Sequence, residues 1–96
     1  MIVSFGDRAT EDVFHGYATA RLRRFPSEVL RLAARKLDML NAASDLRDLR
    51  APPGNRLEKL KGDMEGFHSI RVNDQWRLLF RWSCGDALDV RLTDYH

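Results

Sequence analysis

Residues 67–95, "FHSIRVNDQWRLLFRWSCGDALDVRLTDY", decide the fold, because apolar and polar side chains alternate along three consecutive segments. A period of two is typical of β-strands that bury one face. The segments are residues 67–72, 76–82 and 87–95, and only three or four residues join each one to the next. Such short connections are typical of hairpins, so the sequence predicts an antiparallel meander.

The chain before this meander supplies the helices of an α+β fold. Residues 25–43 repeat apolar side chains at helical spacing and carry a proline suited to the first turn, which predicts an amphipathic helix. A shorter helix is expected over residues 10–16, with Thr10 as its N-cap. Residues 1–5 and 56–60 favour short strands. We therefore expect an N-terminal strand and two helices packed on one face of an antiparallel sheet of four to five strands.

Composition limits the class of protein. The chain, residues 1–96, is long enough for one domain with a modest core, and 44% hydrophobic with 31% charged residues favours a globular fold over disorder. No apolar run could span a bilayer and no signal peptide is visible, so no membrane partner is expected. The single cysteine, Cys84, permits no intrachain disulfide, which makes a reducing cytoplasm the expected location.

The two faces of the predicted sheet differ in chemistry, because successive side chains point to opposite faces of a strand. One set is apolar and should meet the helices: Ile70, Val72, Trp76, Leu78, Phe80, Trp82, Leu88, Val90 and Leu92. The opposite set contains Arg71, Arg77, Arg81 and Arg91, with Tyr95 at the edge and Asp89 as the one acid among them. A merely solvated face would more often pair opposite charges, so this excess of arginine favours a polyanionic partner.

Several classes of active site find no support in the sequence. His15, His68 and His96 have no ligand-like spacing among themselves or with Cys84, so no structural zinc site is expected. There is no glycine loop able to cradle phosphates and no serine in a nucleophile elbow. Neither a metal nor an organic cofactor is therefore expected.

The groups that remain suit metal-free cleavage of RNA: Lys61, Arg77, Tyr95 and His96, with Asp94 beside them. In that reaction the 2′-hydroxyl attacks the adjacent phosphorus and the 5′-oxygen leaves, so a proton must be removed and another supplied. Histidine can transfer protons near neutral pH. Lysine and arginine can neutralise the charge that develops on the phosphate.

The same residues carry a resemblance to a known family. The stretch "NRLEKLKGDMEGFHSIRVNDQWRLLFRW" (55–82), followed by "DVRLTDYH" (89–96), resembles the HigB-type toxins of the RelE/ParE superfamily. The resemblance also includes "SFGDRATEDVF" (4–14) and "LRAPPGNRLE" (49–58), so it covers nearly the whole chain. It implies a RelE-like fold in which two helices cover one side of a sheet and the other side is concave and basic.

The resemblance further implies the toxin of a type II toxin–antitoxin system. Such a toxin is an endoribonuclease that cuts messenger RNA in the ribosomal 30S A site and so inhibits translation. The implied partners are the ribosome, the messenger RNA and a HigA-type helix-turn-helix antitoxin. Two alternatives remain: a ParE-like toxin that inhibits DNA gyrase without cutting anything, and a plain RNA-binding module. The first leaves "LKG", "WR" and "DYH" without a chemical role, and the second lacks exposed aromatic residues for stacking bases.

Three residues match the family's catalytic positions: Lys61 in "LKG", Arg77 in "WR" and His96 in "DYH". Tyr95 lies beside them and is expected to take part in catalysis. The expected RNA-binding residues are Arg71, Asn73, Arg81, Arg91 and Asp94. Two positions depart from the pattern of some members, which carry a histidine where this chain has Glu58 and an arginine where it has Asn73.

Overall fold

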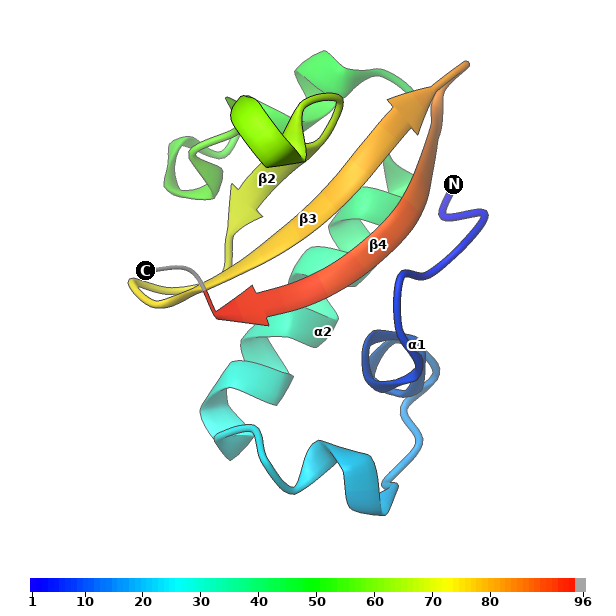
Figure 1. Ribbon diagram of the computed structural model, residues 1–96, viewed down its shortest axis with the longest axis vertical. Helices are drawn as coiled ribbons and strands as arrows, with labels where there is room; N and C mark the ends of the chain where they lie inside the picture. The colour runs from blue at the N-terminus through cyan, green and yellow to red at the C-terminus, as the bar shows by residue number, and fades with distance from the viewer. Residues whose placement is uncertain (95–96) are drawn as a thin grey trace.

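Four antiparallel strands lie side by side in the order in which they occur along the chain (Figure 1). They are β1 (Glu58–Lys59), β2 (His68–Arg71), β3 (Trp76–Ser83) and β4 (Asp86–Asp94). These bounds come from a computed structural model, which describes residues 1–94. Short turns connect β2 to β3 and β3 to β4, so the meander predicted from alternation is confirmed.

Two α-helices, α1 (Arg8–His15) and α2 (Ser27–Ala42), pack on one face of the sheet. Figure 1 shows α2 crossing behind the strands, with α1 beside β4. The described residues also form four short 3₁₀ turns: η1 (Ala20–Leu22), η2 (Leu46–Leu49), η3 (Pro53–Asn55) and η4 (Gly62–Met64). Pro26 directly precedes α2 instead of lying in its first turn. Within the described part of the chain, no helix is long and apolar enough to cross a membrane.

The predicted cap of the first helix was wrong. Asp7 caps α1, because its carboxylate accepts a hydrogen bond from the backbone amide of Thr10 at 2.8 Å. Thr10 lies inside the helix and is buried, and its hydroxyl oxygen accepts a hydrogen bond from the amide of Leu92 at 2.8 Å. The threonine therefore links α1 to β4 across the core, a tertiary role that a local capping rule does not reveal.

The predicted N-terminal strand is reduced to two isolated parallel bridges beside β4, at Ile2 and Phe5. Between these bridges, the hydroxyl of Ser4 accepts a hydrogen bond from the amide of Asp89 at 2.9 Å. The edge of β4 is irregular at this point, because Asp89 has a left-handed backbone with φ of 53°. A continuous ladder cannot form along such an edge, so the sheet has four strands.

A β-bulge at Asp89 also overturns the predicted facing of Leu88. The register between β3 and β4 shifts after Leu79, and Arg81 then pairs with Leu88. Because β4 contains one extra residue at the bulge, the side chains that precede it point to the opposite faces from those that alternation predicts. Ala87 therefore lies in the core, and Leu88 is only half-buried. Strict alternation through residues 87–95 could not anticipate this change.

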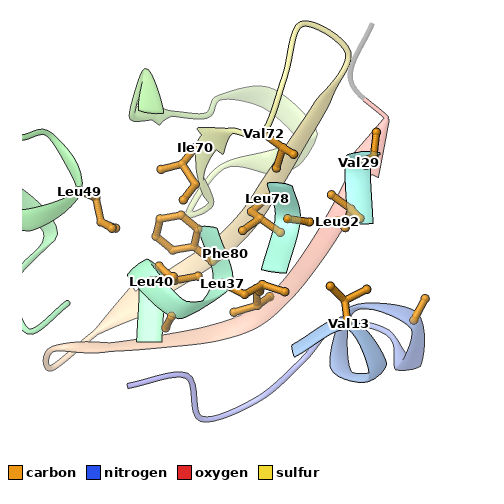
Figure 2. Close-up of a cluster of buried hydrophobic side chains, with 14 of the residues drawn as sticks. Val13, Val29, Leu37, Leu40, Leu49, Ile70, Val72, Leu78, Phe80 and Leu92 are labelled. Atoms are coloured by element: carbon orange, nitrogen blue, oxygen red, sulfur yellow. The ribbon is translucent and has the colours of Figure 1, made fainter. Parts of the chain in front are cut away.

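The main core lies between α2 and the sheet (Figure 2). Its fully buried members include Leu37 and Leu40 from α2 and Leu78, Phe80 and Val90 from the strands. Other residues of the predicted apolar face also belong to this core: Ile70, Val72 and Leu92 are buried, and Trp76 and Trp82 pack against the cluster. Apart from Leu88, the residues predicted to meet the helices do so.

His68 lies on this helix-facing side of the sheet, where its ring stacks on Phe80 with centroids 5.8 Å apart. Burial lowers the pKa of His68 below its ordinary value of 6.5, and the charge of Lys59 lowers it further. The folded protein therefore binds a proton at this position less readily than the unfolded chain does.

This shift makes a prediction about stability and pH. Because the unfolded chain binds more protons, the free energy of unfolding should fall as the pH is lowered from about 6.5 through the depressed pKa of His68. The substitution His68→Gln should remove that part of the loss while leaving the remaining acid dependence. Urea unfolding at a series of pH values measures the difference, and identical slopes for the two proteins would contradict the assignment.

Candidate functional site

The outer face of the sheet, meaning the face turned away from α2, is partly covered by the segment that connects β1 to β2. Leu60 and Phe67, on either side of η4, are buried against Leu79 of β3, and Met64 packs on them. Figure 1 shows η4 in front of the strands, on the side opposite α2. This second hydrophobic cluster fixes the covering segment, and Lys61 is exposed on it beside Leu60.

Arg77, near the start of β3, lies on the outer face, where three acceptors within residues 1–94 contact its guanidinium. One terminal nitrogen, Nη1, donates to the hydroxyl of Ser69 at 3.2 Å and to the backbone carbonyl of Arg56 at 3.4 Å. The other, Nη2, pairs with Oε1 of Glu58 at 3.3 Å. Only 13% of the side chain is exposed, so these contacts fix the orientation of the guanidinium before any ligand arrives.

The loop that supplies the Arg56 carbonyl is itself anchored by a buried amide. Arg56 has a left-handed backbone with φ of 45°, directly after the fully buried Asn55. The Asn55 Nδ2 donates to the carbonyl of Leu49 at 3.1 Å, and its Oδ1 accepts from Lys36 of α2. Burial lowers the pKa of Lys36, and the charge of Arg71 lowers it further. This polar network connects α2 to the acceptors of the site.

Two further predicted arginines flank an aromatic ring on the same face. The guanidinium carbon of Arg81 lies 4.4 Å from the ring centroid of Phe67, and that of Arg91 lies 5.9 Å from it. Arg81 also pairs with Asp89, with Nε and Oδ2 3.4 Å apart. The Arg91 Nε is buried without a hydrogen-bond partner in the described chain. A Cβ at Gly6 would lie 2.6 Å from this nitrogen, so a larger residue at that position would displace the Arg91 side chain.

Three other predicted site residues form hydrogen bonds or ion pairs within or next to the turn between β2 and β3. Arg71 pairs with Asp74, and the side-chain oxygen of Asn73 accepts from the amide of Gln75 at 2.9 Å. Asp94, at the end of β4, accepts from Nε2 of Gln75 at 3.0 Å. Contact of Asn73 and Asp94 with RNA therefore stays a prediction, whereas their hydrogen bonds to Gln75 stabilise this end of the sheet.

The structure thus brings part of the predicted site together. Arg71 and Arg77 are direct partners across β2 and β3, and Arg81 and Arg91 lie on the same face. Tyr95 and His96 lie outside the described residues. No group of three or more His, Cys, Asp or Glu side chains within residues 1–94 is arranged to hold a metal ion.

Sequence reasoning missed two residues that support Arg77. Ser69 shares the outer parity with the arginines and is fully buried, and a small polar residue at that position was the available signal. Asn55 stands in "APPGN", a stretch that indicates only a break between elements. Its role depends on contacts with Lys36 and Leu49, which no local pattern encodes.

Comparisons with known proteins place this geometry in a family. The family model described as the RelE-like toxin of type II toxin–antitoxin system HigB matches residues 4–96. Toxin HigB-1 of Vibrio cholerae is 44% identical over 92 residues, which cover 96% of this chain and 95% of that protein. Endoribonuclease HigB of Proteus vulgaris is 30% identical over the full length of both chains.

Solved structures agree on the fold. A chain of the YoeB-YefM complex from Staphylococcus aureus superimposes with a TM-score of 0.61 at 18% identity, covering 100% of this chain and 98% of that one. A heterotetrameric YoeB-YefM toxin-antitoxin complex from the same organism gives a TM-score of 0.60. The four-stranded sheet, its two helices and the family match lead to one conclusion: this chain belongs to the HigB-like toxins, the RelE-like toxins of type II toxin–antitoxin systems.

Proposed function

We propose that this chain is an endoribonuclease that cuts messenger RNA in the ribosomal A site without a metal ion and is bound by a HigA-type helix-turn-helix antitoxin. The observation that carries the proposal is the fixed guanidinium of Arg77, held by Ser69, Glu58 and the Arg56 carbonyl on an arginine-rich face. The name of the Proteus vulgaris relative supports the reaction class. The toxin–antitoxin complexes among the structural neighbours support the antitoxin.

The reaction requires charge stabilisation, which the described residues are suited to supply. When the 2′-hydroxyl attacks, the phosphorus gains a bond and its oxygens gain negative charge. A guanidinium already oriented by protein acceptors needs little reorganisation to stabilise that charge, and Lys61 is expected to assist from the covering segment. The resemblance assigns proton transfer to His96, with Tyr95 as its neighbour.

The remaining arginines are suited to hold the RNA strand on either side of the cut. Arg81 and Arg91 flank Phe67, and Arg71 lies opposite Arg77. A net charge of only +2 gives weak general affinity for nucleic acid, because that affinity comes from many neutralised phosphates. The ribosome would then supply the positioning that the isolated toxin lacks.

The ParE-like alternative, a toxin that inhibits DNA gyrase, is not favoured. The family model and the two named relatives are HigB toxins. That alternative would also leave the fixed guanidinium of Arg77 without a chemical role.

The first test is cleavage in a translating bacterial extract. Adding the purified toxin should produce cut messenger at discrete positions within ribosome-bound coding sequence, measured by primer extension. Adding the cognate antitoxin first should suppress the cuts. Intact messenger together with gyrase-dependent breaks in supercoiled DNA would reverse the proposal in favour of the ParE-like alternative.

The second test separates two arginines of the same face. The substitution Arg77→Ala should lower the single-turnover rate of cleavage by ~10²–10³-fold, the scale of losing one preorganised donor to a developing oxyanion. Arg81→Ala, a matched loss of charge on the same strand, should act mainly on binding and lose less at saturating ribosome. Thermal melts should show both variants folded. Equal losses in single-turnover rate would contradict the separate roles.

The third test concerns the histidine outside the described residues. Removing His96 should abolish most cleavage on the ribosome, because no other predicted residue transfers protons readily near neutral pH. The melting temperature should change little, because the deletion removes none of the core residues identified within residues 1–94. His96→Gln should fail similarly, because an amide can hydrogen-bond without exchanging its proton. A deletion variant that cuts at the wild-type rate would remove His96 from the mechanism.

A further inference from the structure

The fold holds the acceptors of the Arg77 guanidinium in two different ways. Glu58 and Ser69 are paired residues of β1 and β2, so the ladder between these strands fixes both of them. The carbonyl of Arg56 precedes β1 and lies outside that ladder. Its position therefore depends on the contacts that anchor the loop before β1.

Arg56 has a backbone conformation that residues with a side chain rarely adopt. Its φ of 45° is left-handed, and its amide donates to the carbonyl of Pro53 at 3.3 Å at the end of η3. A residue other than glycine stays in this region only where its surroundings enforce the conformation. Because the conformation sets the direction of the Arg56 carbonyl, whatever enforces it also sets one contact of Arg77.

The side chain of Asn55, the residue directly before Arg56, supplies such contacts. It is fully buried, and its Nδ2 donates to the carbonyl of Leu49 and to Sδ of Met39, each at 3.1 Å. Its Oδ1 accepts from Nζ of Lys36. Rotating the amide by half a turn would place its donors against the lysine ammonium. These partners therefore select one orientation of the Asn55 side chain.

Lys36 connects this buried amide to the helical layer. The lysine belongs to α2, which lies on the opposite side of the sheet from the face that carries the Arg77 guanidinium (Figure 1). It is half-buried, and the oxygen of Asn55 replaces part of the water that its ammonium loses. A continuous series of contacts thus runs from α2 through Asn55 and the Arg56 carbonyl to the guanidinium.

Only the Arg56 backbone separates the fixed amide from the guanidinium. The β1 strand pairs through just two residues, so the ladder alone gives the loop before it little support. We propose that Asn55 and Lys36 are positioning residues for RNA cleavage. They fix the Arg56 carbonyl, and this carbonyl holds the Arg77 guanidinium where negative charge develops on the phosphate. The inference rests on the proposed function for the identity of the reaction.

Matched variants on α2 test this role by kinetics. Lys36→Met leaves the Asn55 oxygen without its donor. It should lower the single-turnover rate on ribosome-bound message by about tenfold or more, since misplacing a catalytic group by about 1 Å costs up to about a hundredfold. The ribosome concentration that gives half of the maximal rate should stay within about twofold of wild type, because none of the proposed RNA-binding arginines is changed.

Arg35→Met is the matched control. Arg35 is the exposed neighbour of Lys36 on α2, and the variant loses the same charge and gains the same side chain. Its rate should stay within about twofold of wild type. Asn55→Ala should repeat the loss seen for Lys36→Met, and if thermal melts show Asn55→Ala to be unfolded, Lys36→Met decides. A wild-type rate for folded Lys36→Met would contradict the proposal.

A double-mutant cycle with Arg77→Ala separates positioning from a general loss of stability. If Lys36 acts through the guanidinium, Lys36→Met should lower the rate of the Arg77→Ala protein by less than about twofold. A loss as large as the one in the wild-type background would show that Lys36 acts independently of Arg77.

A measurement on the free toxin gives a result that does not depend on cleavage. Nitrogen-15 NMR reports how fast the guanidinium rotates about its Cζ–Nη1 bond, and Arg77→Ala assigns the signal. Rotation should be slow in the wild type and in Arg35→Met and faster in Lys36→Met. Equal rotation in wild type and Lys36→Met would overturn the positioning role. Slow rotation that depends on Lys36, in a toxin that cuts no RNA, would refute only the proposed function.

Discussion

The outer face depends on the hydrogen bonds and the ion pair that the guanidinium of Arg77 makes with neighbouring segments. Burying a cation until only 13% of its side chain is exposed costs free energy unless protein acceptors replace the water that it loses. Three segments of the chain supply such acceptors. The β1 strand gives Glu58, β2 gives Ser69, and the loop before β1 gives the Arg56 carbonyl. These acceptors surround the guanidinium only when β1, β2 and β3 pair in the observed register. The pairing of the strands therefore determines where the positive charge of Arg77 lies.

The sheet separates two surfaces that differ in chemistry. On the helical side, α2 and the strands form the main core, and the connector around η1 leaves an apolar groove with a basic rim. On the outer side, the small cluster of Leu60, Phe67 and Leu79 fixes the covering segment and gives two arginines an aromatic ring to lie against. The arginine-rich outer face and the apolar groove therefore lie on opposite sides of the sheet.

Regular alternation made most of the fold predictable, because β2 and β3 contain no extra residue and their apolar faces could be assigned by parity. The prediction failed at Leu88, where the bulge at Asp89 exchanges the faces of β4. It also failed at Thr10, whose hydroxyl serves Leu92, a residue 82 positions away. For the site, alternation along the strands correctly placed the four arginines on one face. The groups that hold the Arg77 guanidinium could not be predicted, because they depend on tertiary contacts. The roles of Tyr95 and His96 rest on the resemblance and stay predictions.

The most direct measurement compares cleavage of one message in two states, free in solution and bound in the ribosomal A site, at physiological salt and saturating toxin. If Arg77 stabilises the transition state as proposed, this weakly charged toxin should cut the ribosome-bound message rapidly in a single turnover and leave the free message largely intact. Equal rates on the two substrates would show that the toxin positions RNA by itself. Absence of cleavage in both states, with folded toxin and intact ribosomes, would contradict the assignment of RNA cleavage to this face.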